Sequence, residues 1–184
     1  MALNATNVMV GTTGGVYVAP TTAAAPTEHD SALDPLFINL GYISDAGISE
    51  TLDKSPQDIR AWQNSALVRR VITESSQTFN MTFIETKKET VQLYYGASVA
   101  ADGSLKIDPS KTGGRKSFVI DVIDGDFIKR TYIPSGEVTE VGDMTYSAGD
   151  PIGYEVTLTA YASTTGDESY SAISWFGAFD TTGA

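Results

Sequence analysis

The sequence contains no cysteine and a single histidine, and both scarcities limit its chemistry. Without thiols there are no disulfides and no thiolate metal sites, which fits synthesis in a reducing cytosol. His29 lies in a stretch rich in proline and alanine, a poor support for a catalytic triad. No HExxH, GxSxG or CxxC motif occurs, and no carboxylate spacing singles out a glycosidase pair. We therefore expect no enzyme, no catalytic residue, no metal and no cofactor.

Long apolar runs and basic residues are also scarce. No run approaches the ~18 apolar residues of a membrane span, and residues 1–15 lack the pattern of a secretory signal. The 12 Lys and Arg face 23 Asp and Glu, which gives a net charge of −11. Such a chain repels phosphate groups, and its basic pairs are dispersed. The sequence therefore indicates neither a membrane protein nor a specific nucleic-acid binder.

One predicted strand shows which residues form each of its faces. Between residues 78 and 83, apolar and polar side chains alternate strictly, which is typical of a strand buried on one side. The apolar face comprises Phe79, Met81 and Phe83. The polar face comprises Thr78, Asn80 and Thr82. The sequence therefore predicts a sheet that is wetted on one side.

Short strands bounded by turn residues recur along the rest of the chain. Asp124-Gly125-Asp126 between two hydrophobic runs predicts a hairpin. The carboxylates Asp121, Asp124 and Asp126 lack EF-hand spacing, so a plain turn is favoured over a calcium site. Ranges 36–43 and 48–52 are expected to pair across residues 44–47. The further strands are expected at residues 8–10, 16–18, 117–123, 127–133, 137–141, 154–161 and 170–179. About nine or ten strands in one 184-residue domain predict an all-β fold, a β-sandwich or partly closed barrel.

A single helix is predicted to flank this sheet. Thr86 and Glu89 match the capping box that starts helices, and Gly96 is typical of the left-handed residue that ends them. The apolar stripe that would pack on the sheet comprises Val91, Tyr94 and Tyr95.

Two stretches read as irregular. Residues 1–32 form an expected N-terminal arm and linker, and the linker (residues 20–32) is expected to be mobile in a free subunit. Residues 53–65 are polar, contain Pro56, and predict a protruding loop or hairpin tip. Trp62 within this loop is either an exposed anchor for another protein surface or a side chain folded back onto its own core. The sequence leaves these two alternatives open.

The order of these elements resembles a known family. The resemblance rests on NVMVGTTGGVYVAP, on LGYISDAGIS followed by a polar loop and IRAWQ, and on VITESSQTFNMTFIET leading into KETVQLYYG. The hairpin FVIDVIDGDFIKRTYIPSGEV completes it. The chain resembles the major tail tube proteins of long-tailed, non-contractile (siphovirus-type) bacteriophages, especially those infecting actinobacteria. The same architecture recurs in contractile tail tubes and in the tube of type VI secretion.

The resemblance implies a structural virion protein. It would be made in the host bacterial cytoplasm, form hexameric rings, and stack them into the hollow tail tube through which double-stranded DNA passes without specific binding. The further implied partners are the tape-measure, tail-tip and tail-terminator proteins. The implied lumen-facing residues are Thr78, Asn80 and Thr82. The implied contacts between subunits or rings are Trp62, Asp58, Arg60, Arg69 and Arg70. The N-terminal arm and the linker (residues 20–32) would become ordered only on assembly.

A different class of function competes with this one. A monomeric β-sandwich could serve as a binding or adhesion module, for example for carbohydrate. Exposed aromatic residues on one flat face would support that alternative, whereas most aromatic residues here alternate into predicted core positions.

Overall fold

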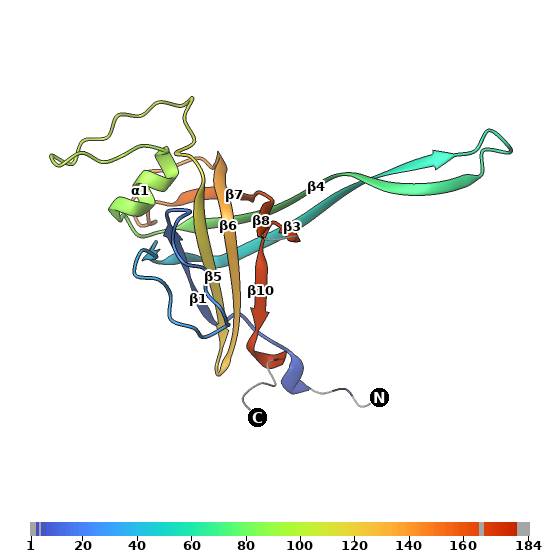
Figure 1. Cartoon of the computed structure of the whole chain (residues 1–184). Helices are drawn as coiled ribbons and strands as arrows, with labels where there is room; N and C mark the ends of the chain where they lie inside the picture. Colours follow the sequence, from blue (N-terminus) through green and yellow to red (C-terminus); the bar gives the residue numbers. More distant parts are fainter. Residues whose placement is uncertain (1–2, 4, 166–167, 180–184) are drawn as a thin grey trace.

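One curved antiparallel sheet contains most of the strand residues of the chain (Figure 1). The computed structural model describes residues 3, 5–165 and 168–179. The sheet has the order β2-β1-β5-β6-β7-β4-β3, β10 also pairs with β6, and β8 and β9 pair only with each other. The elements are η1 (Ala5–Asn7), β1 (Thr13–Ala19), β2 (Ile38–Asn39), β3 (Ile43–Arg60), β4 (Leu67–Phe83), α1 (Lys88–Tyr95), β5 (Lys116–Asp124), β6 (Phe127–Val141), β7 (Tyr154–Ala160), β8 (Ser163–Thr165), β9 (Glu168–Tyr170), β10 (Ile173–Phe176) and η2 (Gly177–Phe179). The predicted all-β fold with one flanking α-helix is confirmed.

The two facing layers of the core come from this single sheet. Strand β6 is long enough to belong to both layers, because its first part pairs with β5 and β10 and its last part pairs with β7. Val16 and Phe118 from the β1–β5 side share one buried cluster with Phe83 and Leu158 from the β4–β7 side. The curvature of the sheet thus gives a sandwich-like core without a second large sheet.

The alternation predicted for β4 is confirmed. Phe79, Met81 and Phe83 are 2%, 2% and 0% exposed. Their β7 partners are Leu158, Val156 and Tyr154, which are buried as well. Burial of each such side chain contributes about 1.5–3 kcal/mol, so these cross-strand pairs anchor the centre of the fold.

The expected pairing of residues 36–43 with 48–52 is wrong. Both Ile43 and Ile48 lie in β3 and pair with β4, opposite Phe83 and Met81. Residues 44–47 bulge between these two pairs, and Gly47 has a φ of 71° there. The turn-like sequence is therefore absorbed as a bulge within an edge strand. Within 36–42, only Ile38–Asn39 forms a strand, and it pairs with β1.

The polar stretch 53–65 protrudes, but most of it is strand rather than loop. The β3–β4 ladder continues to the pair Arg60–Leu67, and the connection comprises only residues 61–66. Pro56 is accommodated because β3 is an edge strand, where a missing N–H leaves no ladder partner unpaired. Beyond the Gln77–Ala160 pair, β4 has no partner other than β3 among the described strands, so the hairpin projects alone (Figure 1). From Gln77 to Leu67 the extended strand spans about 33 Å.

Other predicted boundaries also need correction. Residues 137–141 continue β6 instead of forming a separate strand, and residues 8–10 form no strand. Part of the expected loop at 163–168 forms β8 and pairs with β9, and the last expected strand is shorter, as β10. The predicted hairpin across Gly125 is confirmed as β5–β6.

Helix α1 starts one residue later than its sequence suggested, because its N-cap is Lys87 and not Thr86. Lys87 is the N-cap and makes no side-chain capping bond, so the predicted capping box is wrong. Instead, Thr86 Oγ1 accepts a hydrogen bond from the Tyr154 hydroxyl of β7 at 3.2 Å. Thr90 and Leu93 are the buried residues of α1, while Val91 and Tyr94 are half-buried and pack against the core. The Thr90 hydroxyl donates to the Leu40 carbonyl at 2.6 Å, which fastens the helix to the chain after β2.

The predicted helix stop at Gly96 is confirmed, with a φ of 61°. A Cβ added there would lie 2.7 Å from the Lys111 carbonyl oxygen. We expect Gly96→Ala to lower the free energy of unfolding by more than the ~1–2 kcal/mol that the left-handed conformation costs. Gly103→Ala is the control, since Gly103 has a φ of 82° but no atom near the added Cβ. Equal losses for both variants in urea unfolding would show that the close approach is unimportant.

The expected N-terminal arm is only partly irregular. Strand β1 lies inside the sheet with Val16 at 1% exposure, so residues 13–19 belong to the core. Residues 20–37, called here the crossing segment, pass over the outer face of β5 and β6 and hold Phe37 edge-on to Tyr132 at 6.5 Å. The expected mobile linker therefore has a defined path on the subunit.

Candidate assembly surfaces

The polar face of β4 carries the predicted lumen residues. Thr78, Asn80 and Thr82 are half-buried and lie opposite Thr159, Thr157 and Glu155 of β7. The Asn80 side-chain amide donates to Glu155 Oε1 at 3.1 Å and to Thr157 Oγ1 at 3.2 Å. Hydrogen bonds between side chains thus connect the two strands across this face.

Carboxylates extend the same face on the flanking strands. Glu137 and Glu140 of β6 pair with Thr159 and Thr157, and Asp53 of β3 pairs with Ser76. Cross-strand partners share a face, so these acids lie on the side of Asn80 and Glu155. Sequence reasoning missed their role, although the alternation of Glu155, Thr157 and Thr159 with buried residues was a usable signal. The polar face of β3, β4, β7 and β6 is therefore acidic as well as hydroxyl-rich.

The second surface is the distal hairpin, defined as residues 54–72. At its turn, Trp62 is 96% exposed, which excludes the alternative that it folds back onto its own core. Asn64 and Ser65 have positive φ angles, of 56° and 52°, and the Arg60 guanidinium donates to the Ser65 carbonyl at 3.2 Å. The turn thus presents tryptophan to solvent from a locally fixed backbone.

An ion pair joins the two arms of the distal hairpin. Arg70 donates to both carboxylate oxygens of Asp58, at 2.6 and 3.2 Å, and Arg60 lies 3.5 Å from the same carboxylate. The hydrogen bond from Arg70 lowers the pKa of Asp58 below its ordinary value. Arg69 is exposed and has no carboxylate partner among the described residues. The predicted contact residues therefore gather on one projection.

The third surface is the helix α1 side. The Tyr94 hydroxyl donates to the Gly142 carbonyl at 2.7 Å, and its ring stands edge-on to Tyr154 and Tyr95. Burial raises the pKa of both Tyr94 and Tyr95, so both stay neutral at physiological pH. This cluster fixes the helix to β7 and to the loop after β6.

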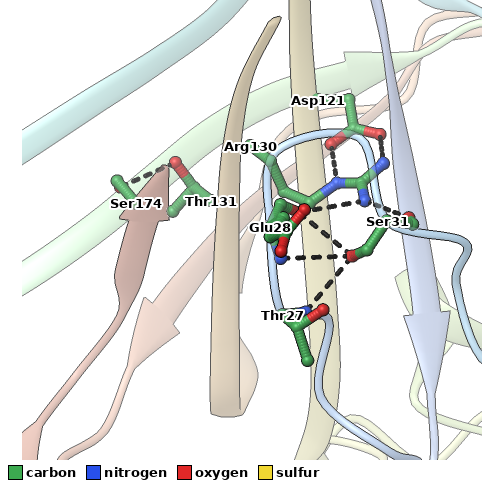
Figure 2. Close-up of polar contacts among 7 residues, drawn as sticks. All are labelled: Thr27, Glu28, Ser31, Asp121, Arg130, Thr131 and Ser174. Atoms are coloured by element: carbon green, nitrogen blue, oxygen red, sulfur yellow. Dashed lines mark hydrogen bonds and ion pairs between the residues drawn. The ribbon is translucent and has the colours of Figure 1, made fainter. Parts of the chain in front are cut away.

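A buried ion pair anchors the crossing segment (Figure 2). Arg130 of β6 binds both carboxylate oxygens of Asp121 of β5 at 2.8 Å, and the two side chains are only 8% and 9% exposed. Arg130 Nη1 also donates to the Ser31 carbonyl at 2.5 Å. The hydrogen bonds with Asp121 raise the pKa of Arg130, so the guanidinium remains charged. Asp121, considered above for calcium, thus has a structural partner.

The possible metal ligands of the described residues are dispersed. In residues 3, 5–165 and 168–179, no three His, Cys, Asp or Glu side chains gather as metal ligands would. His29 lies in the crossing segment, where its ring is close to Gly177. Within the same residues, no helix has the length and apolar character needed to cross a bilayer.

By fold, the chain is a β-rich protein built on one curved sheet with a flanking helix. A family model described as phage tail tube protein matches residues 1–177. The chain belongs to this phage tail tube protein family, and it is a structural subunit of a phage tail tube and thus a component of the virion. The likeness noted in the sequence is confirmed at the family level.

Comparisons with other proteins gave the following. A search of curated protein sequences gave no match. The tail of an empty GTA particle with C6 symmetry is similar at 13% identity and a TM-score of 0.44, over 88% of this chain and 96% of that chain. The 6-fold symmetrised anti-feeding prophage baseplate is similar at 10% identity and a TM-score of 0.47, over 95% of this chain and 97% of that chain. The sheath–tube complex of an extracellular contractile injection system in the extended state is similar at 12% identity and a TM-score of 0.46, over 92% of this chain and 93% of that chain.

Proposed function

We propose that copies of the chain close into hexameric rings, that the rings stack into the tail tube, and that DNA passes through its lumen. One observation carries this proposal: the four-stranded part β6-β7-β4-β3 has an unpaired edge on each side. Strand β3 has no outer partner among the described strands, and β6 has none for residues 137–141, because its pairing with β5 ends at Gly136. Unpaired edges invite pairing with another chain, and closing them around a ring removes both.

The same closure would bring the polar face to the channel. Asn80, Glu155 and the acids of β6 would then line the lumen and repel the phosphates of passing DNA. Neutralising several phosphates produces tight, salt-dependent binding that would hinder movement. The acidic face therefore fits a conduit for DNA better than a binding site.

The remaining roles follow from the family. The subunit acts structurally and not as an enzyme, and the tape-measure, tail-tip and tail-terminator proteins contact the ends or interior of its tube. The subunit is made in the host bacterial cytoplasm. The non-contractile, actinobacteriophage-like assignment rests on the sequence resemblance alone. The competing monomeric binding module would leave both sheet edges unpaired.

Asn80→Lys tests the placement of the polar face. We expect this variant to form tubes in the wild-type amount, because the Asn80 side chain lies on the polar face of β4, away from the core. Six lysines per ring would retain DNA, so genome ejection from particles carrying the variant should slow or stall. Ser104→Lys adds the same charge on an exposed loop and is the control. Normal ejection from correctly assembled Asn80→Lys particles would remove Asn80 from the lumen.

Electron microscopy and sedimentation of the purified protein test self-assembly itself. Rings or tubes support the proposal. A protein that stays monomeric at all concentrations, alone and with tail-tip components, contradicts it.

A further inference from the structure

Basic residues are distributed very unevenly along this acidic chain. Residues 1–53 contain no lysine or arginine but six carboxylates, which are Glu28, Asp30, Asp34, Asp45, Glu50 and Asp53. The distal hairpin holds four basic residues, Lys54, Arg60, Arg69 and Arg70, against the single acid Asp58. Its net charge is thus +3 in a chain of −11, which leaves −14 for all other residues. The projection and the body are complementary in charge.

A notch of about 560 Å³ lies on the body where β3 begins. It is defined by residues 11–14, 41–48, 121 and 122. It exists because the bulge at 44–47 lifts away from β4 and leaves a space beside the start of β1. Asp45 and Tyr42 line this notch, both are exposed, and Tyr42 is 76% exposed. The Glu85 carboxylate borders it by accepting the Tyr42 N–H at 3.1 Å.

The chemistry of the notch matches that of the hairpin tip. An exposed tryptophan packs favourably against an aromatic ring, which Tyr42 provides. An arginine binds a carboxylate, which Asp45 provides. The lining also includes four glycines, Gly11, Gly14, Gly41 and Gly47, which place no side chain in the notch.

The tip cannot reach the notch of its own subunit. Twelve residues of extended strand separate Ile48 from Arg60, a distance of about 40 Å. Tip and notch lie towards opposite ends of the same long strand (Figure 1). Contact between them must therefore be intermolecular and head-to-tail, the type of contact that generates rings and stacks.

We propose that the distal hairpin of one copy docks in the notch of another copy, with Trp62 against Tyr42 and Arg69 facing Asp45. This rests on the self-assembly proposed above and names the site that receives the projection.

Disulfide trapping tests this contact cleanly, because the chain has no cysteine of its own. A bond forms only where two Cα atoms come within about 7 Å. Oxidised tubes of Ala46→Cys/Gln63→Cys should give a ladder of covalent oligomers on a non-reducing gel. The single variants and the control pair Ser104→Cys/Gln63→Cys, in which all sites are exposed, should give none. Tubes without a ladder, or an equal ladder from the control pair, overturn the docking and leave self-assembly intact. If the wild-type chain forms no tubes, both proposals fall.

Charge reversal gives a second, independent readout. Asp45→Lys and Arg69→Glu should each raise the protein concentration needed for tubes by about tenfold or more, as close charge pairs at interfaces do. The combined variant Asp45→Lys/Arg69→Glu should recover most of this loss. A combined variant that assembles no better than the worse single variant overturns the pairing of Arg69 with Asp45.

Discussion

Replacement of Asp121 by alanine is expected to lower the free energy of unfolding by about 3–5 kcal/mol, because it leaves the buried Arg130 guanidinium without its carboxylate. Asp124→Ala is the control, since Asp124 lies three residues away at the hairpin turn and accepts the Val10 N–H at 2.8 Å. Loss of that one bond should cost about 0.5–1.5 kcal/mol. Urea unfolding of the two purified variants measures the difference.

The partner variants separate the ion pair from the crossing segment. Asp121→Ala/Arg130→Met removes both charges and should recover much of the stability lost in Asp121→Ala. Arg130→Lys keeps a charge but cannot reach Asp121 and the Ser31 carbonyl together, so amide exchange should rise in residues 20–37. A loss below about 1 kcal/mol for Asp121→Ala would show that water solvates this pair.

Replacement of Trp62 by alanine is expected to raise the protein concentration needed for tube assembly by about thirtyfold, the effect of a 2 kcal/mol interface hot spot. The stability of the monomer should not change, because the side chain is 96% exposed. Ile107→Ala is the control, since Ile107 is also exposed, at 57%, but lies in the loop after α1. Light scattering against protein concentration measures assembly, and a Trp62→Ala curve that overlays wild type would remove Trp62 from the subunit contacts.

The distal hairpin itself suggests that assembly completes its environment. A two-stranded hairpin with no packing layer is marginal in water. Within the projection, the Asp58–Arg70 pair is exposed, and such pairs stabilise little. Contact with another subunit would supply the missing burial.

Local patterns predicted the parts of the fold that local physics determines. Strict alternation identified Phe79, Met81 and Phe83 as core residues, Asp124-Gly125 gave the β5–β6 hairpin, and Gly96 marked the helix end. These features depend on the pleat of a strand or on one residue's φ angle, so neighbouring residues suffice to recognise them.

Features decided by distant contacts were missed. The Thr86–Glu89 motif matched a capping box, but in the folded chain the Thr86 hydroxyl accepts a hydrogen bond from the Tyr154 hydroxyl. The polar residues around Pro56 were predicted to form a loop, because the pairing with β4 that makes them a strand cannot be seen in the local sequence. The Arg130 contact with Ser31 joins residues 99 positions apart, which no local pattern reveals.

The candidate surfaces divide in the same way. Thr78, Asn80 and Thr82 could be assigned to a wet face from sequence, whereas the acids beside them required the register of β6 and β7. The notch lies between the bulge in β3 and the start of β1, and no local sequence motif predicts that these two segments lie together.

A cryo-electron microscopy map of assembled tubes tests the central claim most directly. The account predicts sixfold rings in which β3 of one subunit pairs with residues 137–141 of the next, while Asn80 and Glu155 face the channel. A tube with these two side chains on its outer surface, or with the β3 edge left unpaired, would contradict it.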